Sequence, residues 1–360
     1  MWSGFTIDDQ FNLVSQDIYK SVNGGPQTLV SPQLANGVVV EGNESPQVCA
    51  DGSVVVWTGH ENDVRHVYKN DGTTTVRLSS NNSSLNSIPQ ISDDCQVISW
   101  TGFDNVNQVY QISRYENGVV TNIATSGGSA VSFNQVLSAD GSVIAWVGLD
   151  ASGQSQLFVQ ENGVIRQITS NMPGNHMGPS LNFDGSIITW TNFDPASQES
   201  NVYMYTNGTI SLIDSYQLSS SAPIFITSTI SQDGNRIVWE DPFGNIHLID
   251  LPSSTTEIIA SNVDLFEQEL RISCDGSVIA FPSFVDGSRT DVFRSFCSSE
   301  ICQPTSVVAE NVVEDAVDAG SPAVTPIPTM GEWGLICLSI LFLIVGIQRI
   351  KEENPEWKLS

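Results

Sequence analysis

The chain has 360 residues, and its 40 Asp and Glu residues outnumber 13 Lys and Arg residues, which gives a formal net charge of −27 at pH 7. This charge repels phosphate backbones and anionic headgroups, so we expect no nucleic acid among its partners. The length accommodates one large β domain and a tail, and an acidic surface with few lysines is typical of an exported protein.

The first thirty residues contain phrases that return later in the chain. WSGF at 2–5 is followed by DIYK at 17–20, NGG at 23–25 and QTLV at 27–30, and WTGF at 100–103 is followed by similar segments. Internal self-similarity indicates a repeat architecture. We therefore interpret the start of the chain as an incomplete copy of a repeat with Trp2 as its aromatic residue; the alternative is a divergent N-terminal arm.

Six further copies each contain an Asp that is followed six residues later by an aromatic residue. The aromatic residues are 43, 46, 44, 49 and 42 residues apart, which is the length of one four-stranded propeller blade. The six pairs are Asp51 and Trp57, Asp94 and Trp100, Asp140 and Trp146, Asp184 and Trp190, Asp233 and Trp239, and Asp275 and Phe281.

Each copy reads as four strands. A short first strand meets the Asp-Gly turn, and the second strand, such as SVIAW at 142–146, is apolar at nearly every residue, as in strands covered on both faces. A third strand carries an apolar residue before an aromatic or His, as in HVYK at 66–69, QVYQ at 108–111 and QLFV at 156–159. Asn-Gly or Asp-Gly turns then lead to a fourth strand.

These observations predict an all-β fold, a β-propeller over residues 1–302 with four-stranded blades. We expect seven blades, the first lacking its first strand and nearly all of its second; the alternative is six blades and an N-terminal arm. If the first copy is truncated, the lack of a signal peptide says nothing about export. We expect the repeat aromatic residues to be buried between neighbouring blades.

The segment ADGSVIAW at 139–146, followed by QLFV at 156–159, resembles the TolB-type (PD40-like) β-propeller repeat. The hallmark of that family is a Pro-Asp-Gly turn, an apolar strand and an aromatic residue. This chain lacks the Pro in every copy, and its second copy has Cys95 in place of the Gly.

Two of the six cysteines are candidates for a disulfide. Cys297 and Cys302 stand where the third and fourth strands of the last blade should pair, close enough for a bridge, although two buried free thiols are the alternative. Cys49, Cys95 and Cys274 all lie at Asp-Gly turns, and their pairing cannot be inferred from the sequence. The cysteine spacing does not indicate a zinc site.

The sequence offers no catalytic constellation. Its histidines are His60, His66, His176 and His247, whereas pectin-degrading lyases with similar propellers need a His-rich metal centre. It has no G-x-S-x-G elbow. Acidic residues in the loops, as in FDNVN at 103–107, suggest Ca²⁺ binding only weakly, because they lack the ligand spacing of a dedicated loop. We therefore expect no enzyme activity and no cofactor.

The favoured function is a binding or protein-interaction module, because propeller faces present variable loops on a rigid ring. Its ligand would be an extracellular or periplasmic protein or a glycan. The alternative is an exported carbohydrate-active enzyme, a lyase or a hydrolase.

Beyond the propeller, residues 303–329 are acidic and then Pro-rich, which is typical of an extended linker. The apolar run GLICLSILFLIVGI at 334–347 predicts a transmembrane helix over about 334–350, with Trp333 at its start. Arg349 and Lys351 follow it, so the positive-inside rule predicts a single-pass protein with the propeller outside the cytoplasm.

The C-terminal segment 327–360 resembles the IPTL-CTERM protein-sorting signal of Gram-negative bacteria. The residues that carry the resemblance are Ile327, Pro328, Thr329, Met330, Trp333 and Gly334, with Met330 in place of the usual Leu. The resemblance implies export, temporary membrane anchorage and cleavage near the motif by an exosortase-type enzyme, which would leave the propeller at the cell surface or secreted. The tail RIKEENPEWKLS at 349–360 is longer and more acidic than the usual basic end.

Overall fold

The computed structural model describes residues 2–7, 13–20, 26, 28–30, 41–62, 64–125, 135–150, 153–218, 226–261, 263, 270–285 and 289–296. All regular elements in these ranges are β-strands, and they form seven antiparallel sheets, which we number blades 1 to 7 in chain order. Five sheets have four strands, whereas blades 1 and 7 have three described strands each.

The first three blades contain β1 to β11. Their strands are β1 (Trp2–Ile7), β2 (Leu13–Lys20) and β3 (Thr28–Leu29) in blade 1; β4 (Glu41–Val48), β5 (Val55–Glu61), β6 (Val64–Asn70) and β7 (Thr75–Arg77) in blade 2; and β8 (Ser83–Ile91), β9 (Val97–Asp104), β10 (Val109–Glu116) and β11 (Val119–Thr125) in blade 3.

The other four blades contain β12 to β26. Their strands are β12 (Val136–Leu137), β13 (Val143–Leu149), β14 (Ser155–Glu161) and β15 (Val164–Gln167) in blade 4; β16 (Asn175–Leu181), β17 (Ile187–Asp194), β18 (Glu199–Thr206) and β19 (Thr209–Gln217) in blade 5; β20 (Ser228–Ile230), β21 (Arg236–Glu240), β22 (Ile246–Asp250) and β23 (Thr255–Ala260) in blade 6; and β24 (Arg271–Ile272), β25 (Val278–Val285) and β26 (Arg289–Phe296) in blade 7.

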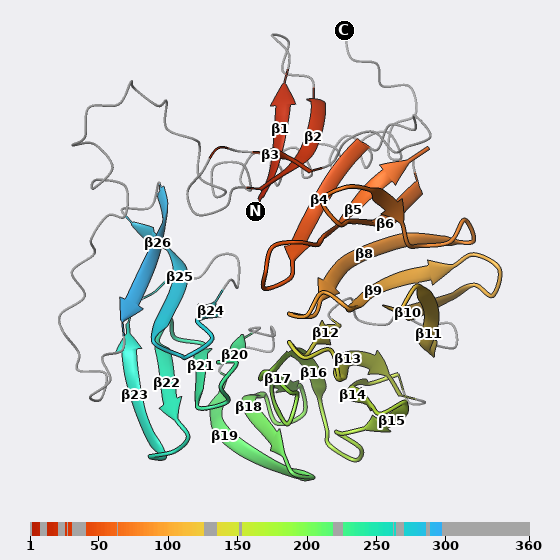
Figure 1. Cartoon of the computed structure of the whole chain (residues 1–360). Helices are drawn as coiled ribbons and strands as arrows, with labels where there is room; N and C mark the ends of the chain where they lie inside the picture. The colour runs from red at the N-terminus through yellow and green to blue at the C-terminus, as the bar shows by residue number, and fades with distance from the viewer. Residues whose placement is uncertain are drawn as a thin grey trace, which may run out of the picture.

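The sheets follow one another around a common centre (Figure 1). The first strands of blades 2 to 7 contact each other in series. The contacting pairs are β4 and β8, β8 and β12, β12 and β16, β16 and β20, and β20 and β24. Stacking blades in this way buries sheet faces that a single blade would expose. The prediction of an all-β fold built from four-stranded antiparallel units is confirmed.

The repeat aromatic residues lie in the core. Their exposed fractions are 0% for Trp57 and Trp190, 1% for Trp100 and Trp239, 4% for Trp146 and 5% for Phe281. Each stands on the second strand of its blade, and β5, β9, β13 and β17 are buried along most of their length. Truncating such a residue to Ala typically costs about 3 to 5 kcal/mol, so these positions dominate the packing of each blade.

The buried indole groups explain why polar residues occur in the first strands. The acceptor stands fourteen residues before the Trp in three blades: Asn43 Oδ1 lies 2.8 Å from Trp57 Nε1, Asn86 Oδ1 3.2 Å from Trp100 Nε1, and His176 Nδ1 3.0 Å from Trp190 Nε1. Burial lowers the pKa of His176 to about 4, so its ring is neutral and can accept. These pairs satisfy donors that burial would otherwise leave unpaired.

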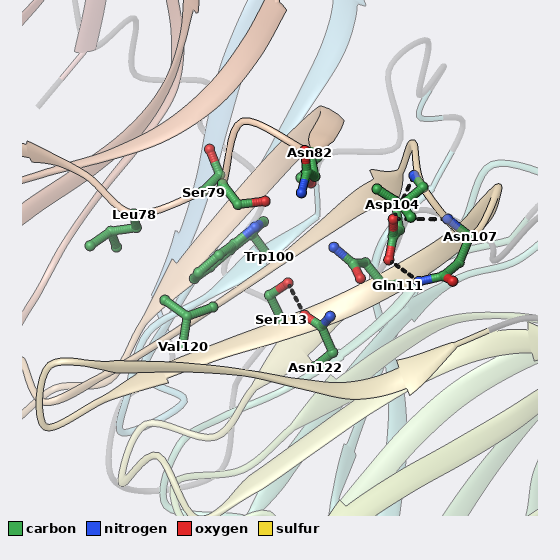
Figure 2. A pocket seen from close by; sticks show the side chains of 13 residues that line it. Leu78, Ser79, Asn82, Trp100, Asp104, Asn107, Gln111, Ser113, Val120 and Asn122 are labelled. Atoms are coloured by element: carbon green, nitrogen blue, oxygen red, sulfur yellow. Dashed lines mark hydrogen bonds between the residues drawn. The ribbon is translucent and has the colours of Figure 1, made fainter.

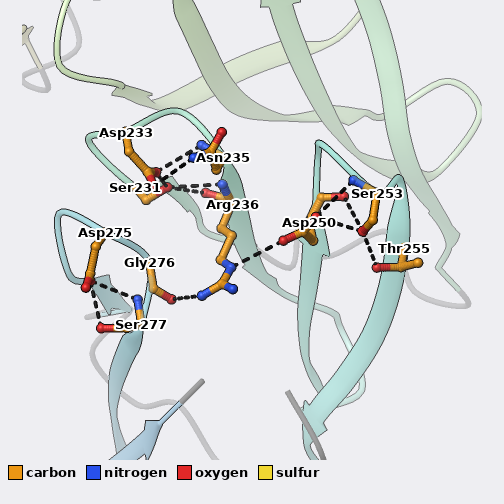
Figure 3. Close-up of polar contacts among 10 residues, drawn as sticks. All are labelled: Ser231, Asp233, Asn235, Arg236, Asp250, Ser253, Thr255, Asp275, Gly276 and Ser277. Carbon is orange, nitrogen blue, oxygen red and sulfur yellow. Dashed lines mark hydrogen bonds and ion pairs between the residues drawn. The ribbon is translucent and has the colours of Figure 1, made fainter. Parts of the chain in front are cut away.

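The turns between first and second strands share one hydrogen-bond pattern, which Figure 3 shows for blade 6, together with the bonds between Asp275 and Ser277 in blade 7. Ser231 Oγ donates to Asp233 Oδ1 at 2.6 Å and accepts the backbone N–H of Arg236 at 3.0 Å. The same carboxylate oxygen accepts the N–H of Asn235 at 3.0 Å. The position two residues before each repeat Asp is therefore polar or Cys, namely Cys49, Ser92, Ser138, Asn182, Ser231 and Ser273.

The residue after each repeat Asp has a left-handed backbone. Its φ lies between 65° and 74° in all six copies: Gly52, Cys95, Gly141, Gly185, Gly234 and Gly276. Space adds a second demand for glycine, because a Cβ on Gly185 would lie 2.5 Å from Cβ of Val143 in the preceding blade. Glycine at this position thus allows both the left-handed backbone of the turn and the close approach of the neighbouring blade.

Backbone hydrogen bonds also join these turns from blade to blade. The Asp93 N–H donates to the Ala139 carbonyl at 2.7 Å, and the Phe183 N–H donates to the Gln232 carbonyl at 2.8 Å. Equivalent bonds run from Ala50 to Asp93, from Asp140 to Phe183 and from Asp233 to Cys274. Blades 2 to 7 are therefore linked in series by the recurring turn, a role that the sequence did not reveal.

A disulfide between Cys49 and Cys95 adds a covalent link between blades 2 and 3. Cys49 occupies the position of the turn Ser, and Cys95 occupies the position of the turn Gly. A bridge across a sequence separation of 46 stabilises by about 4 kcal/mol in the chain-entropy model. Cys274 is exposed and unpaired, and the predicted Cys297–Cys302 bridge lies outside the described residues.

Blade 1 corrects one expectation. Trp2 pairs in register with Tyr19, as Trp57 pairs with Tyr68 in blade 2, so the N-terminal copy follows the repeat. We expected nearly all of the second strand of this copy to be missing. The structure instead has a second strand of six residues, which begins at Trp2. Among the described residues, the structure contains no helix that is long and apolar enough to cross a membrane; the predicted helix at about 334–350 lies outside them.

Candidate functional site

The cross-strand partner of the repeat Trp distinguishes blade 3 from its neighbours. Four blades place an aromatic or His ring directly opposite the Trp and stack it with ring centroids 5.1 to 5.9 Å apart: Trp57 with Tyr68, Trp146 with Phe158, Trp190 with Tyr203, and Trp239 with His247. Blade 3 places Ser113 opposite Trp100.

The cause is the register of the β9–β10 hairpin. The β9–β10 ladder begins at a pair between Asp104 and Val109, just as the β17–β18 ladder begins at Asp194 and Glu199. Tyr110 of the recurring phrase QVYQ follows Trp100 by ten residues, whereas Tyr203 follows Trp190 by thirteen, so Tyr110 stands opposite Phe103 and not opposite Trp100. Tyr110 and Phe103 form an edge-to-face pair with centroids 5.0 Å apart. The phrase lies in the third strand as predicted, but its aromatic residue does not reach the repeat Trp.

A pocket of about 450 Å³ lies beside Trp100, where the other blades have the stacked ring. Figure 2 shows Gln111 and Ser113 of β10 beside Trp100, with Leu78 and Val120 on one side. The rest of the lining is polar and comes from the connection between blades 2 and 3, the β9–β10 loop and β11: Ser79, Ser80, Asn82, Ser83, Asp104, Asn107 and Asn122, together with Val106. The pocket therefore lies at the loop end of blade 3, against blade 2.

Gln111 is the unusual residue in this pocket. Its side chain is only 5% exposed, and its Oε1 atom has no hydrogen-bond partner among the described residues. Buried polar atoms rarely lack a hydrogen-bond partner, because an unpaired one lowers the stability of the folded protein by about 1 to 3 kcal/mol. The Gln111 side chain lines the pocket, so a turn of its amide would bring Oε1 to a donor from a ligand.

The equivalent positions in neighbouring blades are satisfied. Gln111 stands opposite Gly102, and the residues that stand opposite Gly59 and Gly148 are His66 and Gln156. The Nδ1 atom of His66 lies 2.8 Å from Ser79 Oγ, and Gln156 Oε1 accepts a hydrogen bond from Thr169. Blade 3 therefore departs from its neighbours at two positions, Ser113 and Gln111, and both line the same pocket.

Asp104 is the single titratable residue among those that line the pocket. The side-chain amide of Asn107 and the backbone N–H groups of Asn107 and Val106 donate to it and lower its pKa, so it is a carboxylate at neutral pH. No cationic side chain stands among the described lining residues. The pocket offers amides and hydroxyls for hydrogen bonding, without a second titratable group for proton transfer.

The predicted histidines are separate from one another and serve packing. His66 and His176 bind Ser79 and Trp190, and His247 stacks on Trp239 and lies 2.8 Å from Asp241 Oδ2. His60 is partly exposed on β5 and accepts a hydrogen bond from Arg65.

The loop acids that suggested calcium bind their own loops. The carboxylates of Asp104, Asp150 and Asp194 each accept backbone N–H groups from residues two to four positions ahead. Asp241, in a further loop, does the same. One cluster of three potential metal ligands occurs in the described part of the chain, and it consists of Asp51 beside the Cys49–Cys95 disulfide. Asp51 Oδ1 lies 3.3 Å from each sulfur.

Several predicted features lie outside the described residues: the linker at 303–329, the sorting motif residues from Ile327 to Gly334, and Arg349 and Lys351. Comparison with known families shows that residues 325–349 match the IPTL-CTERM motif. No curated protein sequence matches the chain.

Solved structures share the fold at low sequence identity. An oligogalacturonate lyase in complex with manganese superposes with a TM-score of 0.57 and 13% identity, covering 79% of this chain and 84% of the lyase. An oligogalacturonate lyase from Vibrio parahaemolyticus gives 0.57 and 8%, covering 80% and 85%. TolB from Acinetobacter baumannii gives 0.43 and 15%, covering 71% and 62%. The likeness establishes a β-propeller fold and no specific activity.

Proposed function

We propose that this protein is an exported, surface-sorted β-propeller that acts as a binding module. The observation that carries the binding role is the blade 3 pocket, whose lining includes Gln111, with its unpaired Oε1 atom, and a single titratable residue. Glycoside hydrolysis in most enzymes of that class uses two carboxyl groups, and general acid–base chemistry needs a group that can gain and lose a proton near the operating pH. Binding needs only the hydrogen-bonding groups that this pocket has.

Three observations support export. Residues 325–349 match a protein-sorting motif, the net charge is −27, and a disulfide joins blades 2 and 3. Disulfides persist in oxidising compartments such as the periplasm and the cell surface, and they are rare in the cytosol.

The proposed anchor is the apolar segment at about 334–350, with Arg349 and Lys351 on the cytoplasmic side. Replacing Leu341 and Ile344 by Arg would cost about 2.5 to 3.5 kcal/mol of insertion free energy for each charge. Expressed with a working signal peptide in a cell without an exosortase, the parent protein should be in the membrane fraction and the double variant in the soluble fraction. A parent protein that is soluble and uncut would contradict the anchor.

An exported carbohydrate-active enzyme is the competing function, since two structural neighbours are oligogalacturonate lyases. We expect the purified propeller to release no unsaturated product from polygalacturonate when Mn²⁺ is supplied. Ultraviolet absorbance measures that product, and turnover above that of a heat-denatured sample would contradict the proposal that the protein only binds.

A further inference from the structure

We infer that the blade 3 pocket binds one neutral sugar unit of a glycan, a hexose or an N-acetylhexosamine. The inference rests on the proposed binding function and adds the chemical class of the ligand. It follows from the hydrogen-bonding groups, the charge and the size of the pocket.

The hydrogen-bonding groups suit a ligand with many hydroxyls. Gln111 lines the pocket and its Oε1 atom lacks a donor; when the amide turns toward the pocket, a sugar hydroxyl can donate to Oε1 while accepting from a neighbouring amide. Ser113 Oγ donates to Asn122 Oδ1 at 3.1 Å, which fixes the Asn122 amide and leaves its Nδ2 group as a donor at the pocket wall. Asn82 adds a further amide at the opposite side (Figure 2).

The charge of the pocket disfavours acidic ligands. Its one charged lining residue is the Asp104 carboxylate, and an arginine or lysine that could pair with a uronate or phosphate does not stand among the described lining residues. An anionic sugar would lose its hydration without gaining an ion pair, and the net charge of −27 would repel it further. A neutral sugar avoids both penalties.

The size and the apolar side chains fit one sugar ring. Ligand pockets typically measure about 300 to 1,000 Å³, and this one measures about 450 Å³. Leu78 and Val120 supply apolar surface for the C–H groups of a sugar, while Trp100 closes the base of the pocket. A small polar additive would need fewer apolar contacts, and an apolar ligand would leave Gln111 unpaired.

The central variant is Gln111→Leu, which removes the unpaired buried acceptor at nearly constant volume. Deleting a satisfied buried amide normally destabilises a protein, whereas deleting an unsatisfied one does not. We therefore expect Gln111→Leu to keep or raise the melting temperature and to weaken sugar binding by about tenfold or more. The matched control is Gln156→Leu in blade 4, which should lower the melting temperature through the loss of the Thr169 bond and leave sugar binding unchanged.

The probes are the methyl glycosides of glucose, galactose, mannose and N-acetylglucosamine, with galacturonate and glucuronate as the anionic arm. Ligand-observed NMR and calorimetry on the oxidised full chain measure their affinities. The inference predicts that at least one neutral glycoside binds and that both uronates bind about tenfold more weakly or not at all. Tighter uronate binding, binding unaffected by Gln111→Leu, or binding of no neutral glycoside would overturn it.

A second measurement separates this inference from the proposed function. The immobilised protein is tested for retention of extracellular polysaccharides and of secreted proteins from a bacterium that encodes an exosortase. Retention of a protein partner with no neutral sugar bound would overturn the sugar inference and leave the binding role standing. If the immobilised protein retains nothing and no sugar binds, both fail.

Discussion

The two ends of the blade strands follow opposite rules. At the end where first and second strands join, six turns share an Asp and a left-handed residue after a Ser, Asn or, in one turn, Cys, and backbone bonds connect each turn to the next. At the end where second and third strands join, blade 3 places Tyr110 opposite Phe103, has Ser113 and no ring opposite Trp100, and leaves Gln111 Oε1 unpaired.

The difference separates what holds the ring together from what contacts a ligand. A feature present in every copy meets a demand that every blade shares, here the junction with the next blade. A departure in one copy that costs stability needs another reason, since natural proteins accept strain and unpaired groups mainly at functional sites. We therefore assign stability to the turn end and binding to the loop end of blade 3.

The largest effect is expected at the covalent link between turns. Replacing both Cys49 and Cys95 by Ala should lower the free energy of unfolding by about 4 kcal/mol, measured by urea denaturation of the oxidised protein. Cys49→Ser with Cys95→Gly should cost less, because it restores the Ser and Gly of the other turns. Cys274→Ser is the control and should have little effect, since Cys274 is exposed and unpaired. Equal stability of the Ala double variant and the parent would contradict the bridge.

The next largest loss of stability is expected where neighbouring blades approach each other closely. Gly185→Ala should cost about 3 kcal/mol, because Gly185 has a φ of 68° and a new Cβ would lie 2.5 Å from Val143. Gly208→Ala is the matched control, with a φ of 82° and no neighbouring atom within 4 Å of the new Cβ, so it should cost about 1 kcal/mol. Equal losses for the two variants would show that the turn glycines serve backbone conformation alone.

A smaller effect is expected from pH. Hydrogen bonds from Ser273 and Ser277 hold the pKa of Asp275 well below its usual range, and N–H and hydroxyl donors also lower the pKa values of Asp51 and Asp184. A lowered pKa in the folded state stabilises the protein above the unfolded pKa of about 4, and this contribution is lost as pH falls below it. The melting temperature should therefore fall between pH 5 and pH 3, and less steeply in Asp275→Asn. An identical slope in the variant would contradict the assignment.

The repeat could be predicted from sequence because its demands are local. The Asp-Gly turn, the apolar second strand and the buried Trp each leave a pattern at a fixed offset, and these predicted the all-β propeller. The pairing of Cys49 with Cys95 could not be predicted, since it depends on how closely two turns from different blades approach. Asn43 and His176 were missed as indole acceptors because fourteen residues separate donor from acceptor and the acceptor is Asn in one blade and His in the other.

The pocket could not be predicted either, because it depends on the register of a hairpin. The phrase QVYQ looks like the third-strand phrase of its neighbours, and only the pairing register of β9 with β10 shows that Tyr110 meets Phe103 and leaves Trp100 facing Ser113. The register of a hairpin depends on its loop and its packing, so one residue of difference changes every pair. The sorting motif, in contrast, is contiguous in sequence and was confirmed over residues 325–349.

The measurement that tests the division between stability and binding most directly is Ser113→Phe, which returns to blade 3 the ring that other blades stack on their Trp. The ring would occupy the pocket beside Trp100 and bury apolar surface in place of a 2% exposed hydroxyl. The account predicts an equal or higher melting temperature, together with loss of the neutral glycoside binding that the parent protein has. A lower melting temperature with binding retained would contradict it.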